Sequence, residues 1–180
     1  MRSVSAAEQA CRDSVRCGIH HRPGKAGMSL FDELAKQYYE IDRQYLKREM
    51  IARSRGLSRC ERHYQSRRRA NDHAYFLLMF TRLEGYIRHE SAELIRKMKD
   101  SVLPFREKAA WGILPHEPDD RIWFMNRVAL LTPKGEKDYN TVVTYYKERN
   151  SIAHGGDFIS PIHMPDVIAE LERLHMVLKA

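Results

Sequence analysis

This 180-residue sequence has no long apolar run, few cysteines and little strand-like patterning. No apolar run approaches the ~18 residues that a membrane-spanning helix needs, so we predict no membrane association. Cys11, Cys17 and Cys60 are too few and unevenly placed for a disulfide framework, which favours a reducing, cytoplasmic location. Cys11 and Cys17 with His20 and His21 match no compact zinc-finger spacing, so no metal or other cofactor is expected.

Basic residues are what the sequence has in excess. The formal net charge is +7, and Arg outnumbers Lys by 21 to 10. A guanidinium group can pair bidentately with phosphate oxygens, so an arginine-rich protein suits contact with nucleic acid. The length allows one domain of ordinary size with a substantial core. We therefore expect a single basic domain with RNA among its candidate partners.

Residues 1–27 differ in composition from the rest of the chain. They contain few large apolar residues, end in RPGKAG and lack the continuous apolar segment of a signal peptide. We interpret them as a disordered leader, and translation from Met28 is an alternative start. Residues 28–180 are then the domain proper.

The domain sequence predicts helices throughout. Apolar residues recur at helical spacing over 29–50, 73–99, 119–131, 138–156 and 164–178, with a short helical piece between Pro104 and Pro115. Ser29 and then Asn71 or Asp72 are the expected N-caps of the first two helices. The prediction is an all-α, up-and-down bundle of four or five helices.

A strongly basic segment, residues 53–69, lies between the first two predicted helices. Arg67, Arg68 and Arg69 could neutralise phosphates there, and Tyr64 could stack on a base. The same residues are equally compatible with a solvated helix extension or linker. The sequence leaves these two interpretations open, and no helix-turn-helix signature supports a DNA-binding protein.

The stretch RNSIAHGG places Arg149, Asn150 and His154 at the end of a predicted helix, before two glycines. The spacing from Arg to His is not informative alone, because it recurs at 16–21, 68–73 and 82–89. Context distinguishes this copy, since an amphipathic helix precedes it.

On that helix, one apolar stripe is expected to contain Tyr139, Val142, Val143, Tyr146 and Ala153. At ~100° per residue, the side chains at 149 and 154 would flank this stripe ~140° apart. Such a separation is wide for one substrate. A second copy of the helix across a two-fold axis would bring two such pairs together, which favours a site at a homodimer seam.

The motif RNSIAHG resembles the Arg-x4-6-His signature of the HEPN superfamily, in its Arg-Asn-x-x-x-His form. The helical layout and Glu84, in FTRLEGYIR, are similar to that superfamily too. The resemblance implies a dimeric four- or five-helix bundle and, in many members, a metal-independent ribonuclease, so the expected substrate is single-stranded RNA or tRNA. Such enzymes act as toxins of toxin–antitoxin pairs, in antiviral defence or in RNA processing, so an antitoxin or companion protein is implied. Other members are non-catalytic binding modules.

Metal-free RNA cleavage uses the 2′-hydroxyl as nucleophile and needs a proton carrier and a fixed positive charge. His154 could carry the proton and Arg149 could stabilise the charged phosphorane. Asn150 would orient the arginine or the phosphate, while Tyr145 and Tyr146 could hold the substrate. The alternative interpretations are structural. Arg149 could simply pair with Glu84, and the imidazole at position 154 could cap free helix carbonyls.

Overall fold

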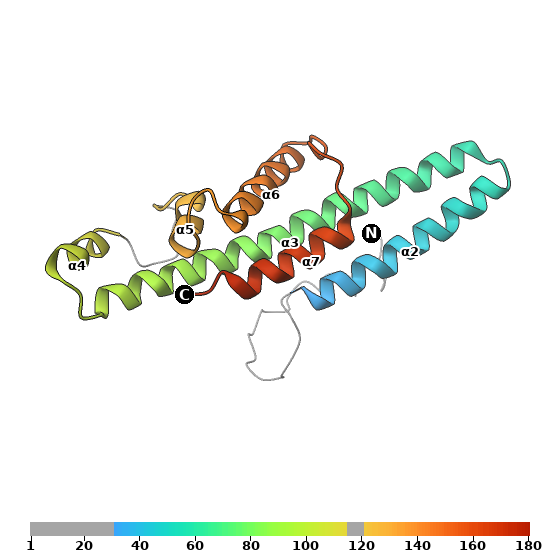
Figure 1. Cartoon of the computed structure of the whole chain (residues 1–180). Helices are drawn as coiled ribbons and strands as arrows, with labels where there is room; N and C mark the ends of the chain where they lie inside the picture. The colour runs from blue at the N-terminus through green and yellow to red at the C-terminus, as the bar shows by residue number, and fades with distance from the viewer. Residues whose placement is uncertain (1–30, 115–120) are drawn as a thin grey trace, which may run out of the picture.

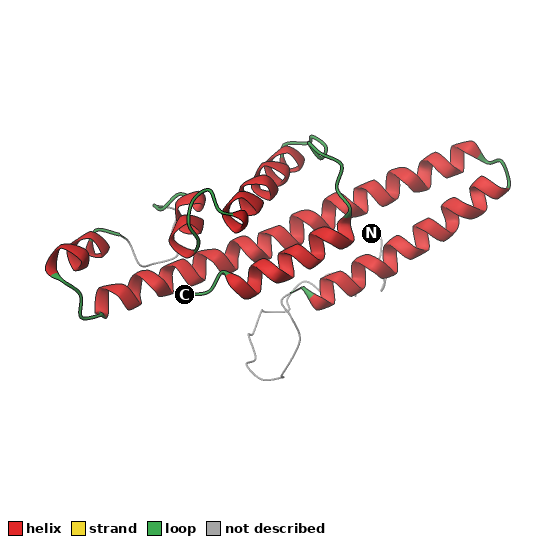
Figure 2. Ribbon diagram, in the orientation of Figure 1, coloured by secondary structure: helices red, strands yellow, loops and turns green. Residues whose placement is uncertain are grey.

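A computed structural model describes residues 31–114 and 121–180 of the chain. The described residues form six helices and no strand: α2 (Asp32–Ser54), α3 (Ser58–Asp100), α4 (Phe105–Gly112), α5 (Phe124–Leu131), α6 (Lys137–Ala153) and α7 (Met164–Val177). Figures 1 and 2 show their arrangement around the long α3. The all-α class is therefore confirmed, with more helices among these residues than the four or five expected. The predicted leader 1–27, both its cysteines and the Ser29 cap lie outside the described residues.

The expected N-cap at Asn71 or Asp72 is wrong, because both residues lie inside α3. This helix has 43 residues and is about 65 Å long at 1.5 Å per residue. It begins just after a tight turn at Gly56, whose φ of 63° is in the left-handed region that favours glycine. The basic segment 53–69 thus forms the tip of a helical hairpin made by α2 and α3.

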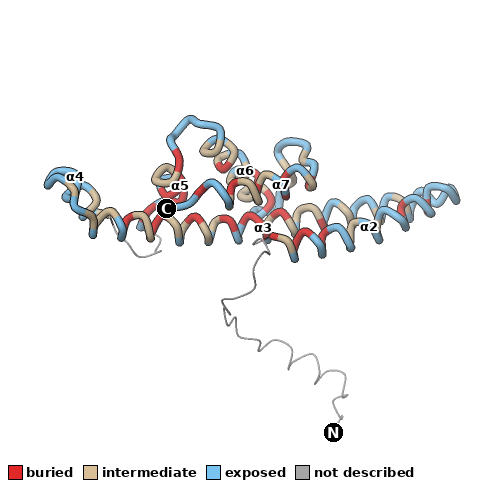
Figure 3. Tube along the Cα trace, turned by 60° about the horizontal axis from the view of Figure 1, so that its bottom comes forward, coloured by how far each residue is buried: buried red, intermediate tan, exposed pale blue. Residues whose placement is uncertain are grey.

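The core surrounds the middle of α3, as the burial colours of Figure 3 show. Helices α5, α6 and α7 all pack on α3, and α2 packs along its first half. The fully buried α3 side chains Phe76, Phe80, Leu83 and Ile87 recur every three or four residues, which is the spacing of one helix face. The remaining core residues come mainly from α7, α2 and α5. No helix of the described residues is long and apolar enough to cross a membrane.

The predicted buried stripe of α6 needs one correction. Ala153, expected in the buried stripe of α6, is exposed, and Ile152 is buried instead. At the N-terminus of α5, 62% of the surface of Trp123 is likewise exposed, whereas its neighbour Phe124 is buried. In both cases the burial differs by one residue, because the helix presents the adjacent position to α3.

Candidate functional site

Helix α6 ends at Ala153 through a Schellman motif built by the two glycines. The amide of Gly155 donates to the carbonyl of Ile152 at 3.0 Å, and the amide of Gly156 donates to the carbonyl of Ser151 at 2.9 Å. Gly155 has φ +81°, a conformation that costs other residues energy. His154 is the last residue before this reversal, so the motif determines where its side chain leaves the helix.

Gly156 is required for a second reason, which is close approach. A Cβ atom built at this position would lie 2.8 Å from Ser151 Oγ and 2.9 Å from the Ser151 carbonyl oxygen. The same Ser151 hydroxyl donates to the carbonyl of Asp157 at 2.7 Å. The chain after His154 therefore folds tightly back over the last turn of α6.

Arg149 and Asn150 interact with each other and with α3. Arg149 Nη1 donates to Asn150 Oδ1 at 3.0 Å, and its Nη2 lies 3.8 Å from Glu84 Oε2. Glu84 Oε1 also accepts from Arg88 Nη2 at 3.0 Å. Glu84 is mostly buried, with 13% of its side chain exposed, while a third of Arg149 remains accessible. The expected neighbourhood of Glu84 and Arg149 is thus present, and Arg88 is an addition that the sequence did not indicate.

His154 lies on the surface at the other side of this helix end. It borders a shallow, open depression of about 510 Å³ lined by Lys147, Asn150, Ser151, His154, Gly156 and Ile159. No contact between His154 and Arg149 occurs among the described residues. Asn150 is shared, because it lines the depression with His154 and also accepts the hydrogen bond from Arg149. Asn150 therefore lies beside both residues, although Arg149 and His154 do not converge on one point.

Tyr145 and Tyr146 pack against the core. The ring of Tyr145 meets Phe76 edge-on at 5.9 Å, and the ring of Tyr146 lies 5.1 Å from Phe124 and 6.4 Å from Phe80. Burial raises the pKa of the Tyr145 hydroxyl, and the nearby charge of Glu170 adds to the rise. Both rings are only partly buried, but their main role in this arrangement is to anchor α6 to α3 and α5.

Glu148 is the residue that sequence reasoning missed. Its side chain is almost fully buried, and its carboxylate accepts the backbone amides of Ile159 at 2.6 Å and Ser160 at 3.1 Å. These bonds hold the segment after the glycines against α6. The position stands between Lys147 and Arg149 in the sequence, so nothing in the pattern distinguishes it from a surface charge.

Asp157 ties the same segment to α3. Its carboxylate forms an ion pair with Arg69 and lies 2.8 Å from His73 Nε2. The ring of Phe158 then packs edge-on against His73 at 4.7 Å and Phe76 at 5.4 Å. Residues 157–160 are thus fixed on both α6 and α3, which holds one wall of the depression in place.

The basic residues that we predicted to bind RNA differ in their surroundings. Arg68 is bonded to Asp42 at 2.8 Å and Glu49 at 3.2 Å within the α2–α3 hairpin. Arg69 is bonded to Asp157, whereas Arg67 is exposed. Tyr64 is half-buried beside Cys60 in a groove between the two helices.

Comparisons with family models, curated proteins and solved structures find no match for this chain. The resemblance of residues 149–155 to the HEPN signature therefore stays an expectation.

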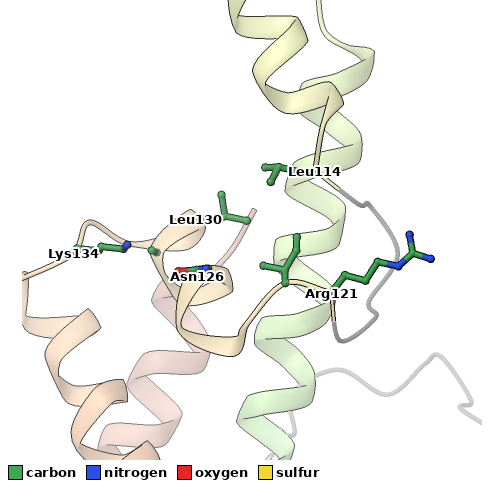
Figure 4. Close-up of a pocket in the computed structure, with 7 residues that line it drawn as sticks. Leu114, Arg121, Asn126, Leu130 and Lys134 are labelled. Carbon is green, nitrogen blue, oxygen red and sulfur yellow. The ribbon is translucent and has the colours of Figure 1, made fainter.

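A separate cavity of about 420 Å³ lies beside α5 (Figure 4). Its walls are largely aliphatic, with Leu114, Ile122 and Leu130 among them. The side chain of Arg121 extends away from Asn126 and Leu130 in this view. Its polar lining residues are Arg121, Asn126 and Lys134, and none of the predicted site residues lines it.

Proposed function

We propose that the protein is a metal-independent endoribonuclease that acts as a homodimer. The observation that supports this most is the grouping of Arg149, Asn150 and His154 at one helix end, with Glu84 behind the arginine. A fixed cation and an exposed imidazole joined by a hydrogen-bonding amide are the groups that phosphodiester cleavage requires. The resemblance to the HEPN signature favours the same activity and a role as a toxin or in antiviral defence.

In the proposed reaction, a neutral His154 imidazole removes the proton of the RNA 2′-hydroxyl. The 2′-oxygen attacks the adjacent phosphorus, the bond to the 5′-oxygen breaks, and the protonated His154 of a second copy donates its proton to that oxygen. The products are a 2′,3′-cyclic phosphate and a 5′-hydroxyl. Arg149 stabilises the additional negative charge on the phosphorane, and Asn150 and Glu84 orient its guanidinium.

The separation of Arg149 and His154 within one chain is the reason to invoke a second copy. Arg149 is held toward α3 by Glu84, whereas the imidazole opens on the solvent side of α6. Two copies related by a two-fold axis through this helix end would place each exposed His154 near the Arg149 and His154 of the second copy. Analytical ultracentrifugation should then find a dimer at micromolar concentration, and a monomer alone would contradict the composite site.

The test is a nuclease assay in EDTA on total RNA and labelled oligonucleotides, with analysis of the product ends. The variants are Arg149→Ala and His154→Ala. The matched controls are Arg82→Ala and His89→Ala, since this pair on α3 is exposed and falls within the same range of spacings. We expect cleavage by the wild type and both controls to leave a cyclic phosphate, and a loss of at least 100-fold in the two site variants.

One observation favours a second candidate, a non-catalytic helical module that binds nucleic acid, nucleotide or a partner protein. Arg149 already has Asn150 and Glu84 as partners within the chain, which is sufficient for a structural role. Absence of cleavage by a folded dimer, or equal cleavage by all five proteins, would favour this module over the enzyme.

A further inference from the structure

The charge of this protein is concentrated at the tip of the α2–α3 hairpin. Residues 43–70, which we name the arm, contain ten Arg and Lys residues against two Glu, a net charge of +8. The whole chain has a net charge of +7, so the other 152 residues together have a net charge of −1. The arm projects beyond α6 and α7 in Figures 1 and 3 and packs chiefly against itself. The basic character of the protein is therefore that of one projecting element.

Some charges of the arm are paired with one another or with Asp42. Arg53 Nε donates to Glu61 at 2.7 Å, and Arg68 bridges Glu49 and Asp42. Glu49 and Glu61, the two glutamates of the arm, are both paired in this way. Seven of the ten cations have no carboxylate partner among the described residues, and all seven are exposed: Arg43, Lys47, Arg48, Arg55, Arg59, Arg62 and Arg67.

The arm also has a groove between its two helices. It has a volume of about 170 Å³, and its lining includes Arg48, Arg55, Cys60 and Tyr64. At ~100° per residue, Arg48 and Arg55 lie within ~60° of the groove-lining Ala52 around α2. Arg67 follows Cys60 by seven residues and so lies ~20° from it around α3. Two unpaired arginines, Arg48 and Arg55, therefore line a groove that contains an aromatic ring, and Arg67 continues the same face of α3 about 10 Å beyond Cys60.

We propose that this groove binds single-stranded RNA, with phosphates paired to Arg48, Arg55 and Arg67 and one base against Tyr64. A cationic groove with an aromatic platform is the general arrangement for unpaired strands. Nine of the ten cations are arginines, which bind phosphate bidentately, and this favours nucleic acid over a lipid surface that attracts Lys and Arg alike.

The proposed groove is separate from the depression at His154. The two share no lining residue, and Tyr64 and Cys60 precede Arg69, which pairs with Asp157 beside the depression, by about 8 and 14 Å along the axis of α3. Binding at the groove does not depend on cleavage and can be measured in a His154→Ala protein. Absence of RNA cleavage would therefore not contradict RNA binding at the groove, and absence of binding at the groove would not contradict cleavage at His154.

The experiment is fluorescence anisotropy with a labelled 20-nucleotide single-stranded RNA, a matched RNA duplex and phosphatidylserine vesicles, all in the His154→Ala background. The test variant changes Arg48, Arg55 and Arg67 to Glu. The control changes Lys47, Arg59 and Arg62 to Glu, which alters net charge equally. These control side chains lie ~140–160° from Ala52 or Tyr64 around their helices, away from the groove. Circular dichroism confirms that each variant is folded.

We expect the groove variant to lose at least tenfold more affinity for the single strand than the control does. The slope of log K against log salt should also become shallower by about 2, because each phosphate contact on a single strand contributes ~0.7. Tyr64→Ala should weaken binding by roughly 5- to 100-fold, whereas Tyr64→Phe retains the ring and the affinity. Equal losses in both triple variants, tighter binding to duplex, or binding to vesicles without RNA would each overturn the proposal.

Cys60 provides an independent readout because it is exposed within the groove. In a protein with Cys11→Ser and Cys17→Ser, bound single-stranded RNA should slow maleimide labelling of Cys60 at least fivefold. An unchanged labelling rate at saturating RNA would show that the strand binds elsewhere.

Discussion

Removal of the Glu148 carboxylate should loosen the segment that follows His154 and lower the stability of the whole domain. Glu148 is 2% exposed, and it accepts the amides of Ile159 and Ser160. Hydrogen bonds to a charged group contribute about 1.5–3 kcal/mol each. The two amides belong to exposed residues, so water can replace part of the lost interaction. We therefore expect Glu148→Ala to reduce the free energy of unfolding by about 2–3 kcal/mol, and Glu148→Gln by about 1–2 kcal/mol.

For a domain of this size these losses correspond to about 4–12 °C in Tm for the alanine variant. The assay is thermal and urea unfolding followed by circular dichroism. Glu40→Gln is the matched control, because Glu40 is exposed on α2 and should change the free energy by less than ~0.5 kcal/mol. If Glu148→Ala melts within 1 °C of both the wild type and Glu40→Gln, the two amide bonds contribute nothing and the inferred clamp is wrong.

Three further substitutions test other parts of the structure by the same unfolding assays. Gly85→Ala should raise stability by about 0.5–1 kcal/mol, because Gly85 lies within α3 and an added Cβ meets nothing within 4 Å; a lower Tm would contradict this. Gly156→Ala should lower stability by about 1–3 kcal/mol, because its Cβ would press on Ser151, and an unchanged Tm would show that the turn can relax. Burial lowers the pKa of His175, which faces Phe31, Tyr86, Glu90 and Lys179. The unfolded chain then takes up the proton first, so stability should be full above pH ~6.5 and fall below it by up to ~1.4 kcal/mol per pH unit. His175→Phe should reduce that dependence, and an unchanged pH profile would contradict the assignment.

The sequence predicted the helical class and the end of α6 because both depend on local signals. Apolar spacing marked the core face of α3 from Phe76 onward, and paired glycines marked the stop at Gly155. The sequence left open whether Glu84 pairs with Arg149, 65 positions later, and the structure places the two side chains 3.8 Å apart. Each residue borders an apolar stripe, and two stripes that pack together bring their edges into contact.

Prediction failed where the buried side chains are polar. The α2–α3 seam within the arm contains Glu49 and Arg68, so apolar periodicity gave no signal for the first four turns of α3. Glu148 was missed for the same reason, because it is a buried polar residue. Its burial depends on amides eleven and twelve residues later in the chain. Such positions are determined by tertiary hydrogen bonds, and a hydrophobic pattern does not record them.

The distribution of charge bears on how the two proposed sites would work together. Residues 28–42 and 71–180, the bundle outside the arm, have a net charge of −4 and no long-range attraction for a polyanion. The arm, with a net charge of +8, attracts one at a distance comparable with the Debye length. An RNA bound at the arm then stays close to the bundle, which raises the local concentration of its scissile phosphate at Arg149 and His154. In a nuclease of this design, neutralising the arm should raise KM for long RNA and leave kcat unchanged. A dinucleotide has a single phosphodiester, which is the scissile one, and so has no second phosphate for the groove. Dinucleotide substrates should therefore be cleaved equally by the wild type and the groove variant.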